Sequence, residues 1–357
     1  MAQAAKFLVK IFSPDRSTPR MVLNDKSILT VPSIVREVNK PASDVTLDLA
    51  ISWDDAAYAE TYGLNPYDLV EIDAITETYP NGYRVFTGNI QELKVRYGAQ
   101  ENRVIIRVFP IEAEFTFYFW INTYVSTVDT ADVFDDAVDA VNGSYSPQLT
   151  KNIATTGQVH QPAYSGYVIA GLNSEMENLN ASWYWRVRPN LQLDLQQYSD
   201  SVATHTLTVG KDVDTVQNIK SLIDVVNYAR IEFFDGITVH STVYQNAASV
   251  AAYGLRNFYQ SLGSSSQGQS DSVGNNLIEN QGDLFTKTQL VVNAQYPIET
   301  ILPGDTVKIQ NLTTAQQAWL SGILRVVRVR YDGATAVLDL SIITDNYGVE
   351  LGKLISG

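Results

Sequence analysis

The chain of 357 residues contains no cysteine. This absence excludes disulfide bonds, thiolate catalysis and zinc sites built on Cys ligands. It fits an extracellular particle that assembles without oxidative folding. Methionine is also scarce, with 3 residues, whereas tyrosine reaches 20. That balance favours strands and interfaces over bundled helices.

Long apolar runs are missing as well. No stretch approaches the roughly 18 uncharged apolar residues that a membrane helix requires, and the most apolar run, 115–120, is short. The first residues, Met1 to Phe7, lack the apolar centre of a signal peptide. These absences predict a soluble chain that is made in the cytoplasm and does not insert into membranes.

Positive charge is in short supply. The 25 Lys and Arg residues face 39 Asp and Glu residues, which gives a net charge of −14. Because binding to nucleic acid through its phosphates depends on Lys and Arg, this balance argues against that class of function. The acidic balance suits a surface that nucleic acid slides past without sticking. The hydrophobic fraction of 45% and the charged fraction of 18% are typical of a globular protein, and the length allows about two to four domains.

The motifs of common enzyme sites are absent too. The chain has no HExxH, GxSxG, GxGxxG or P-loop sequence. Its three histidines are His160, His205 and His240, and none is spaced with another His, Asp or Glu as metalloenzymes require. We interpret them as structural or surface residues. The sequence therefore predicts no enzyme and no catalytic, cofactor-binding or metal-binding residues.

One acidic segment is the best remaining candidate for a site. Between Arg107 and Lys151 there is no Lys or Arg but there are seven acids: Glu112, Glu114, Asp129, Asp132, Asp135, Asp136 and Asp139. A short helix is predicted inside it, capped by Asp132, stopped by Gly143 and apolar at Phe134, Ala137, Val138 and Val141. The segment is interpreted either as a cation or glycosidase site or as a solvated helix face. The solvated face is favoured, because the glycine and the spacing of a calcium loop are lacking.

Aromatic and arginine clusters allow two interpretations each. The runs 115–120 and 183–185 are suited to stacking on sugar rings, or to strands that are buried on both faces or packed between domains. The buried strand is favoured. The pair Arg186 and Arg188 beside Pro189 is interpreted as fixing a turn or forming an interface ion pair rather than binding a ligand.

The most informative feature that is present is an internal duplication: a strand-rich module occurs at residues 64–110 and again at residues 301–343. The first copy opens with LNPYDLVEI and the second with ILPGDTVKI. A step of nine residues then leads from glycine to tyrosine in both, from Gly88 to Tyr97 and from Gly322 to Tyr331. This alignment makes Arg96 and Arg330 equivalent and favours a structural or interface role for both. A duplication also favours quasi-symmetric assembly over a single catalytic pocket.

The remaining pattern extends these copies into a predicted domain order. Residues 1–111 predict a first small β-barrel, and residues 112–203 an α+β domain. A second barrel is predicted from residues 204–245 and 288–345 together, and it includes a hairpin at 229–244. The fold class is thus mainly β with α+β insertions: two duplicated barrels plus two smaller α+β domains.

The insertion between the parts of the second barrel is predicted at residues 246–287. Helical spacing covers 246–262, and a polar, low-complexity segment follows at 263–276. Residues 346–357 are expected to form a C-terminal tail.

Four stretches together resemble the hub protein family of long-tailed bacteriophages, the trimeric baseplate or tail-tip hub. They are REVNKPA with VTL (36–42 and 45–47), SWYWRV (182–187), SVAAYGLR (249–256) and ILPGDTVKI (301–309). They cover most of the chain in the family's order. The first copy of the repeat departs from the pattern, since Asn65-Pro66-Tyr67 stands where the second copy has Leu302-Pro303-Gly304.

The resemblance implies a structural virion protein of the phage tail. Its barrels would be tube-like, and three chains would present six of them, adapting a six-fold tail tube to a three-fold tip around the DNA channel. The expected partners are two further copies of the chain, distal tail or tube ring proteins, and a tip, spike or fibre protein. DNA would pass through the lumen without specific binding, and no cofactor is expected.

Two alternatives from other classes stay open at this point. One is a distal tail or host-recognition component that uses residues 112–200 to hold saccharide or a partner protein. The other is a cell-wall glycosidase that uses Asp135, Asp136 or Asp139.

Overall fold

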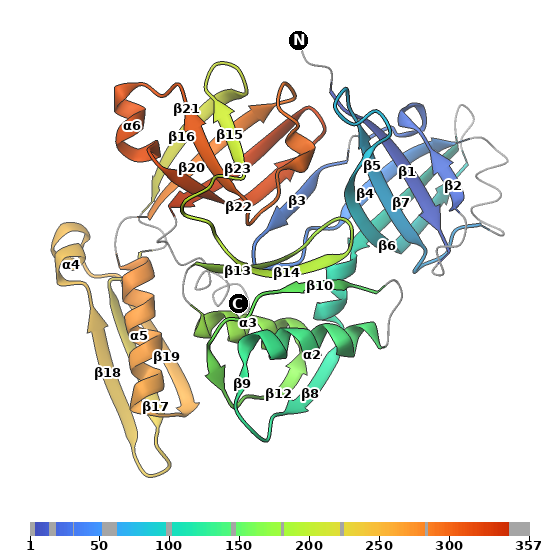
Figure 1. The fold of residues 1–357 in the computed structure, drawn as a ribbon. Coiled ribbons are helices and arrows are strands. Elements are labelled where there is room, and N and C mark those ends of the chain that lie inside the picture. Colours follow the sequence, from blue (N-terminus) through green and yellow to red (C-terminus); the bar gives the residue numbers. More distant parts are fainter. Residues whose placement is uncertain are drawn as a thin grey trace. The chain divides into compact units, whose positions relative to one another are not determined.

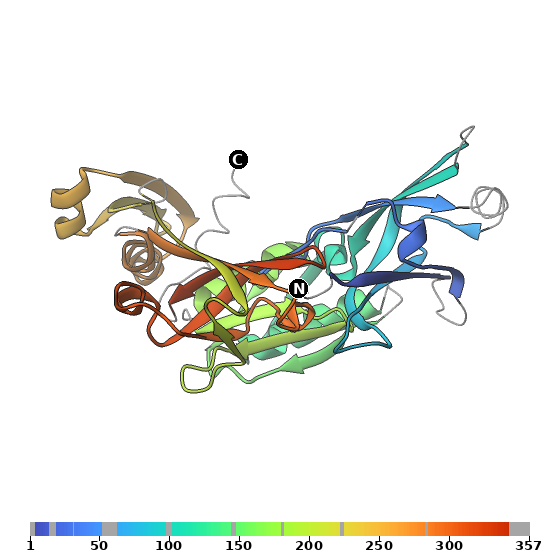
Figure 2. The same ribbon diagram turned by 90° about the horizontal axis from the view of Figure 1, so that it is seen from above.

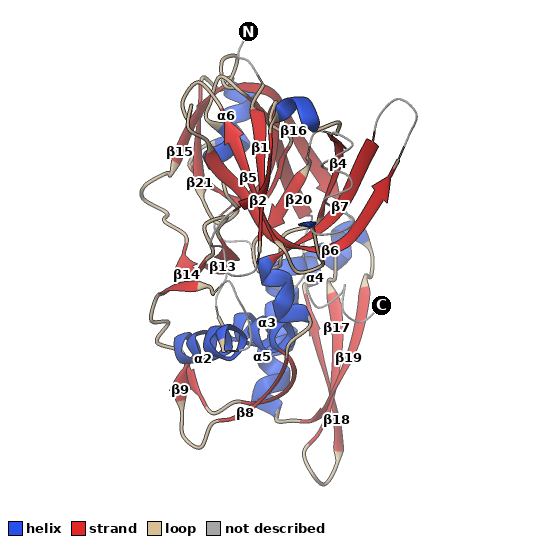
Figure 3. Ribbon diagram, turned by 90° about the vertical axis from the view of Figure 1, so that its right-hand side faces the viewer, coloured by secondary structure: helices blue, strands red, loops and turns tan. Residues whose placement is uncertain are grey.

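The computed structural model describes residues 4–13, 19–30, 32–51, 63–97, 102–143, 148–179, 182–221, 225–282 and 285–342 (Figure 1). Strands account for 49% of the residues and helices for 19%, and the predominance of strands is plain in Figure 3. The predicted fold class, mainly β with α+β insertions, is therefore confirmed. The chain divides into two compact units, Met1–Val216 with Leu290–Ile343 (unit 1) and Gln217–Gln289 with Thr344–Gly357 (unit 2).

The first half-barrel of unit 1 is a six-stranded antiparallel sheet in the order β2-β1-β5-β6-β7-β4. Strands β1 and β7 alternate between buried and less buried side chains, as half-buried strands do. The bounds are β1 Lys6–Phe12, β2 Pro19–Leu23, β4 Val45–Ile51, β5 Leu69–Ile75, β6 Tyr83–Arg96 and β7 Asn102–Pro110.

The second half-barrel contains a seven-stranded sheet in the order β15-β21-β22-β23-β20-β16, with β3 added to β22. Its central meander β21-β22-β23 repeats the meander β5-β6-β7 of the first sheet. Both sheets share one hydrophobic core. The bounds are β3 Ile34–Glu37, β15 His205–Thr208, β16 Val213–Ser221, β20 Phe285–Asn293, β21 Thr306–Gln310, β22 Ile323–Tyr331 and β23 Thr335–Ile342.

The α+β part of unit 1 packs two helices and a three-stranded sheet, β10-β14-β13, around a second core. Two ribbons, β8-β12 and β9-β11, complete it. The bounds are β8 Phe119–Thr123, β9 Val128–Asp129, α2 Thr130–Asn142, β10 Thr150–Ile153, β11 Val159–His160, β12 Ala163–Tyr167, α3 Val168–Asn178, β13 Trp183–Val187 and β14 Gln192–Gln197. The short helix η3 Ile111–Thr116 leads into this part from β7. Further short helices of unit 1 lie in the half-barrels, at η1 Asp25–Ser27, η4 Ile298–Thr300 and α6 Thr314–Leu320.

Unit 2 is a three-stranded sheet in the order β18-β17-β19 with helix α5 beside it (Figure 1). Val273, Leu277 and Ile278 of α5 pack against Ala229 and Ile231 of the central strand. The bounds are β17 Tyr228–Phe234, β18 Val239–Gln245, α4 Ala247–Tyr253, β19 Asn257–Ser264 and α5 Gln267–Gln281. No helix in the described ranges of either unit is long and apolar enough to cross a membrane.

Three predictions about this region were wrong. The hairpin at 229–244 forms β17 and β18, but it belongs to the sheet of unit 2 and not to the second barrel. The predicted helix at 246–262 ends at Gly254, whose φ of 77° breaks it, and β19 follows and pairs with β17 in parallel. The predicted low-complexity loop at 263–276 lies largely within α5, because apolar side chains at helical spacing pack on the sheet.

The predicted tail at 346–357 lies outside the described residues. The division of the chain into the five predicted segments stays a prediction.

Candidate functional site

The second copy of the repeat opens on a tight turn at residues 302–305. Asp305 N–H donates to the carbonyl of Leu302 (3.1 Å), and the Asp305 carboxylate accepts from Leu302 N–H (2.9 Å). Pro303 occupies the second position, and Gly304 the third with a φ of 92°. This is the pattern of a type II turn, which favours Pro and then Gly at these positions.

The first copy has the same turn at residues 65–68. Asp68 N–H donates to the carbonyl of Asn65 (3.1 Å), and the Asp68 carboxylate accepts from Asn65 N–H (2.8 Å). The third position is Tyr67, whose φ of 76° is unfavourable for a residue with a side chain. Its hydroxyl donates to Glu114 (3.4 Å), which holds the ring in place.

Each turn is fastened by the same two hydrogen bonds to the second strand that follows it, β6 in the first copy and β22 in the second. In β6, Ile90 accepts from the third turn residue (2.7 Å) and donates to the fourth (2.9 Å). In β22, Val326 makes both bonds at 2.8 Å. One residue further on, each strand carries a β-bulge, at Gln91 and at Val327. The duplication predicted from the sequence is therefore confirmed in detail, since turn, fastening and bulge all recur.

The predicted register of the second landmark was wrong by two residues. With Ile90 equivalent to Val326, Tyr331 aligns with Val95, and Arg330 with Lys94 rather than with Arg96. The shared glycine-to-tyrosine step misled the alignment. Spacing from the turn was the better guide, since Asp68 precedes Ile90 by 22 residues and Asp305 precedes Val326 by 21.

Strand β3 joins the two half-barrels. It pairs antiparallel with Arg328–Tyr331 of β22, although the chain around it belongs to the first sheet. Its Arg36 guanidinium donates to the carbonyl of Val85 in β6, and burial lowers the pKa of Arg36 to about 10. Directly after β3, Asn39 exchanges hydrogen bonds with the backbone of Trp185, at 2.8 and 2.9 Å. A four-residue strand thus ties together both sheets and the α+β part.

A buried ionic network holds the second turn. Arg186 contacts Asp194 (2.9 Å) and Asp305 (2.8 Å), and Asp305 also contacts His205 (2.9 Å). The other ring nitrogen of His205 lies 2.9 Å from the hydroxyl of Tyr296. The side chains of Arg186, Asp194, Asp305 and His205 are all buried.

Arg186 also donates to the carbonyl of Pro303 (2.7 Å). Of the two roles predicted for Arg186 and Arg188, fixing a turn or forming an ion pair, Arg186 has both, and Arg188 forms an ion pair with Asp194 (2.6 Å).

Mutual pairing in this network outweighs the cost of burial. Burial opposes the charged form of Asp305, but the hydrogen bond from His205 and the charge of Arg186 hold its pKa below the usual range. Burial likewise opposes the charged form of Arg186, but Asp305 and its other partners raise its pKa above the usual value. Both groups are therefore charged across the physiological range, and their mutual pairing anchors the turn.

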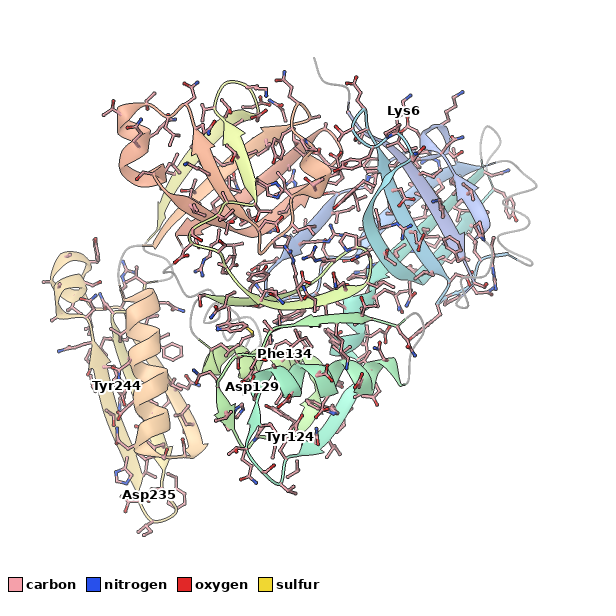
Figure 4. All side chains as sticks on the ribbon, in the orientation of Figure 1. Lys6, Tyr124, Asp129, Phe134, Asp235 and Tyr244 are labelled. Carbon is pink, nitrogen blue, oxygen red and sulfur yellow. The ribbon has the colours of Figure 1, made fainter. Side chains whose placement is uncertain are left out.

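The acidic segment forms the predicted helix, with a different cap. Helix α2 begins at Thr130, so the N-cap is Asp129, labelled in Figure 4, and not Asp132. Asp132 instead completes a capping box as the third helical residue. The cap lies earlier because the Asp129 carboxylate also accepts from Thr156 (2.7 Å) and Gly157 (2.7 Å). The predicted apolar face is confirmed, since Phe134, Ala137, Val138 and Val141 are all buried.

The other acids of the helix contact ordinary partners. Asp135 and Asp139 flank Lys151 at 2.8 and 2.6 Å, and Asp136 accepts from the hydroxyl of Tyr124 (2.7 Å). In the described part of the chain, no group of three or more His, Asp or Glu side chains is placed to hold a metal ion. The arrangement is that of a solvated helix face.

Replacing the N-cap tests this assignment. Asp129→Ala is expected to lower the free energy of unfolding by about 1–2 kcal/mol, because the cap and the Thr156 and Gly157 bonds are lost together. Partial burial opposes the charged form of Asp129, but its hydrogen bonds outweigh burial and hold its pKa below the usual range. The loss should therefore be full above about pH 4 and vanish as the pH falls through that lowered pKa.

Urea denaturation across this pH range measures the effect of the Asp129 substitution. Asp139→Ala, on the exposed face of the same helix, is the matched control and should change stability by less than about 0.5 kcal/mol. Equal effects of the two substitutions would contradict the assignment of Asp129 as the cap.

Each histidine is paired with one carboxylate. The pairs are His160–Glu175 (2.9 Å), His205–Asp305 (2.9 Å) and His240–Asp235 (2.7 Å). They lie in three different parts of the fold, so the three rings do not converge on one site.

The two aromatic runs differ in the structure. Strand β13, which holds Trp183–Val187, is buried along its whole length, as predicted for a strand covered on both faces. The run 115–120 is not one strand: Phe115 belongs to the short helix η3 and is buried in the core, and Trp120 of β8 stacks on Tyr164. Phe117 and Phe119 are more than half exposed.

Sequence reasoning missed the pairing of β3 with β22 and the carboxylate of Glu175. Glu175 is 1% exposed and accepts from Thr130 (2.9 Å) as well as pairing with His160. For the burial of Glu175 and for the pairing of β3 the sequence offers no local signal.

No protein-family model and no curated protein sequence matches the chain. Solved structures match nearly all of it. The 43 kDa tail protein of prophage MuSo2 from Shewanella oneidensis is 12% identical, with a TM-score of 0.62 over 96% of this chain and 99% of that one. The tail protein from Neisseria meningitidis MC58 is 10% identical, with a TM-score of 0.63 over 95% and 99%. The prophage tail protein gp18 from Listeria monocytogenes EGD-e is 9% identical, with a TM-score of 0.55 over 98% and 100%.

The chain therefore has the fold of these phage tail proteins. The resemblance to the phage tail family is confirmed at the level of fold.

Proposed function

We propose that this chain is a structural, non-enzymatic hub protein of a phage-type tail tip or baseplate, present in the virion as a trimer. The observation that carries the proposal is the duplicated turn, fastening and bulge within one polypeptide. Three copies of a chain with two equivalent half-barrels present six similar elements with three-fold symmetry. Such a trimer can meet a six-fold tail ring on one side and a three-fold tip on the other.

The charge of the chain supports a channel for DNA. A net charge of −14 disfavours adhesion of phosphates, so DNA can pass a lumen built by this chain without specific binding. The proposed partners are distal tail or tube ring proteins and a tip, spike or fibre protein. No cofactor enters the proposal.

Native mass spectrometry of the purified chain over a range of concentrations tests the stoichiometry. The expected species has three copies of the 39.5 kDa chain. A ring of six copies would instead favour a distal tail protein. Loss of cell-wall turbidity that Asp136→Asn abolishes would favour a glycosidase.

A further inference from the structure

Half of strand β6 has an open edge. On the side of β5, pairing covers residues 83–89 of β6 and stops at the bulge. From Glu92 to Arg96 the strand pairs with β7 on its other side only. Among the described residues, no strand pairs with the free side. This half of the hairpin of β6 and β7 is drawn in teal in Figure 2.

The equivalent edge of the second half-barrel is occupied. The register set by the turn and bulge makes Glu92–Val95 equivalent to Arg328–Tyr331. Those four residues of β22 pair antiparallel with the four residues of β3, from Glu37 opposite Arg328 to Ile34 opposite Tyr331. The chain itself therefore shows what a partner on this edge looks like.

Burial differs between the two edges as a missing strand predicts. Val329 and Tyr331, next to β3, are each 4% exposed. Their equivalents Leu93 and Val95 face the same core but are only partly buried. An added strand would remove this apolar surface from water and satisfy the open backbone groups.

Charges on the outer face do not prevent pairing. Glu92 and Lys94 form an exposed ion pair there, and edge charges commonly discourage unwanted strands. Yet the equivalent Arg328 and Arg330 are also exposed, and β3 pairs beside them with Glu37 opposite Arg328. Such charges select a partner strand of complementary charge.

We propose that the edge of β6 at Glu92–Val95 receives an antiparallel strand from a second copy of this chain. The addition would repeat between neighbouring chains the joint that β3 makes between the two half-barrels of one chain. Three copies then close a ring of six half-barrels, in which an added strand bridges each pair of neighbouring half-barrels. The inference rests on the trimer of the proposed function and adds the surface through which the copies join.

Because the chain has no cysteine, a single introduced one gives a unique attachment point. Lys94→Cys and, as the matched control, Arg330→Cys are labelled with a benzophenone maleimide. Each variant is mixed in equal amounts as isotope-labelled and unlabelled chain, brought to the concentration at which trimers form, and irradiated. Crosslinked peptides are identified by mass spectrometry.

At position 94, mixed-isotope crosslinks to one extended segment of another chain are expected. At position 330, where β3 already fills the edge, crosslinks within one chain to residues 34–37 are expected. A trimer in which position 94 gives no mixed-isotope crosslink would overturn this inference and leave the proposed function standing. Absence of any trimer would overturn both.

Discussion

The Arg186→Met variant is expected to lose about 3–5 kcal/mol in free energy of unfolding. Arg186 is the cation between two buried carboxylates, Asp194 and Asp305, and it also bonds the carbonyl of Pro303. Methionine has a similar length and no charge, so the change leaves buried negative charge with less compensation while largely preserving volume. Urea denaturation at pH 7 measures the loss.

An exposed ion pair supplies the control for Arg186→Met. Asp44→Ala removes the partner of Arg107 on the surface and should cost less than about 1 kcal/mol. The pH adds a second readout. The pKa of Asp305 is lowered in the folded state, so its contribution is present above its unfolded pKa and is lost as the pH falls through the folded one. Removing Arg186 should weaken that dependence, and a loss below 1 kcal/mol at pH 7 would contradict the anchoring role.

The Gly304→Ala variant is expected to lose about 2–4 kcal/mol. Gly304 has a φ of 92°, which alanine adopts with strain, and an added Cβ would overlap the buried ring of Tyr184. Strain and overlap therefore add. The same denaturation experiment measures the change.

Gly322→Ala separates these two causes. Gly322 has a φ of 103°, but an added Cβ meets nothing within 4 Å, so only the backbone cost of about 1 kcal/mol is expected. If Gly304→Ala cost no more than Gly322→Ala, packing of Tyr184 against the turn would contribute nothing.

The turn was predictable because its chemistry is local. Pro303 and Gly304 set the turn type, and Asp305 closes it by bonding its own backbone. The first copy was recognisable only by comparison with the second, since Tyr67 is unusual at a position with positive φ. The helix of the acidic segment was predictable from its apolar spacing, but its cap was not, because Asp129 is held by Thr156 from a distant segment.

Unit 2 was mispredicted because its signals are weak or non-local. The helix α5 is rich in Ser, Gln and Gly, a composition typical of linkers, and only a few apolar side chains fix it to the sheet. The parallel pairing of β17 with β19 depends on neighbours that local periodicity cannot identify. The ionic network escaped prediction for the same reason, since Arg186 and Asp305 lie far apart in the sequence.

The placement of β3 has a consequence for how the polypeptide reaches its native state. Val35 pairs with Arg330, so a strand made among the first residues must wait for almost the last described strand before its ladder can form. Contacts between residues this far apart in the sequence slow folding. Until β22 is available, the unpaired β3 is also prone to pair with a wrong strand or with another chain. The sheet of the second half-barrel therefore cannot be completed until β22 has been made, and synthesis of β22 becomes the event that brings β3 into its native place.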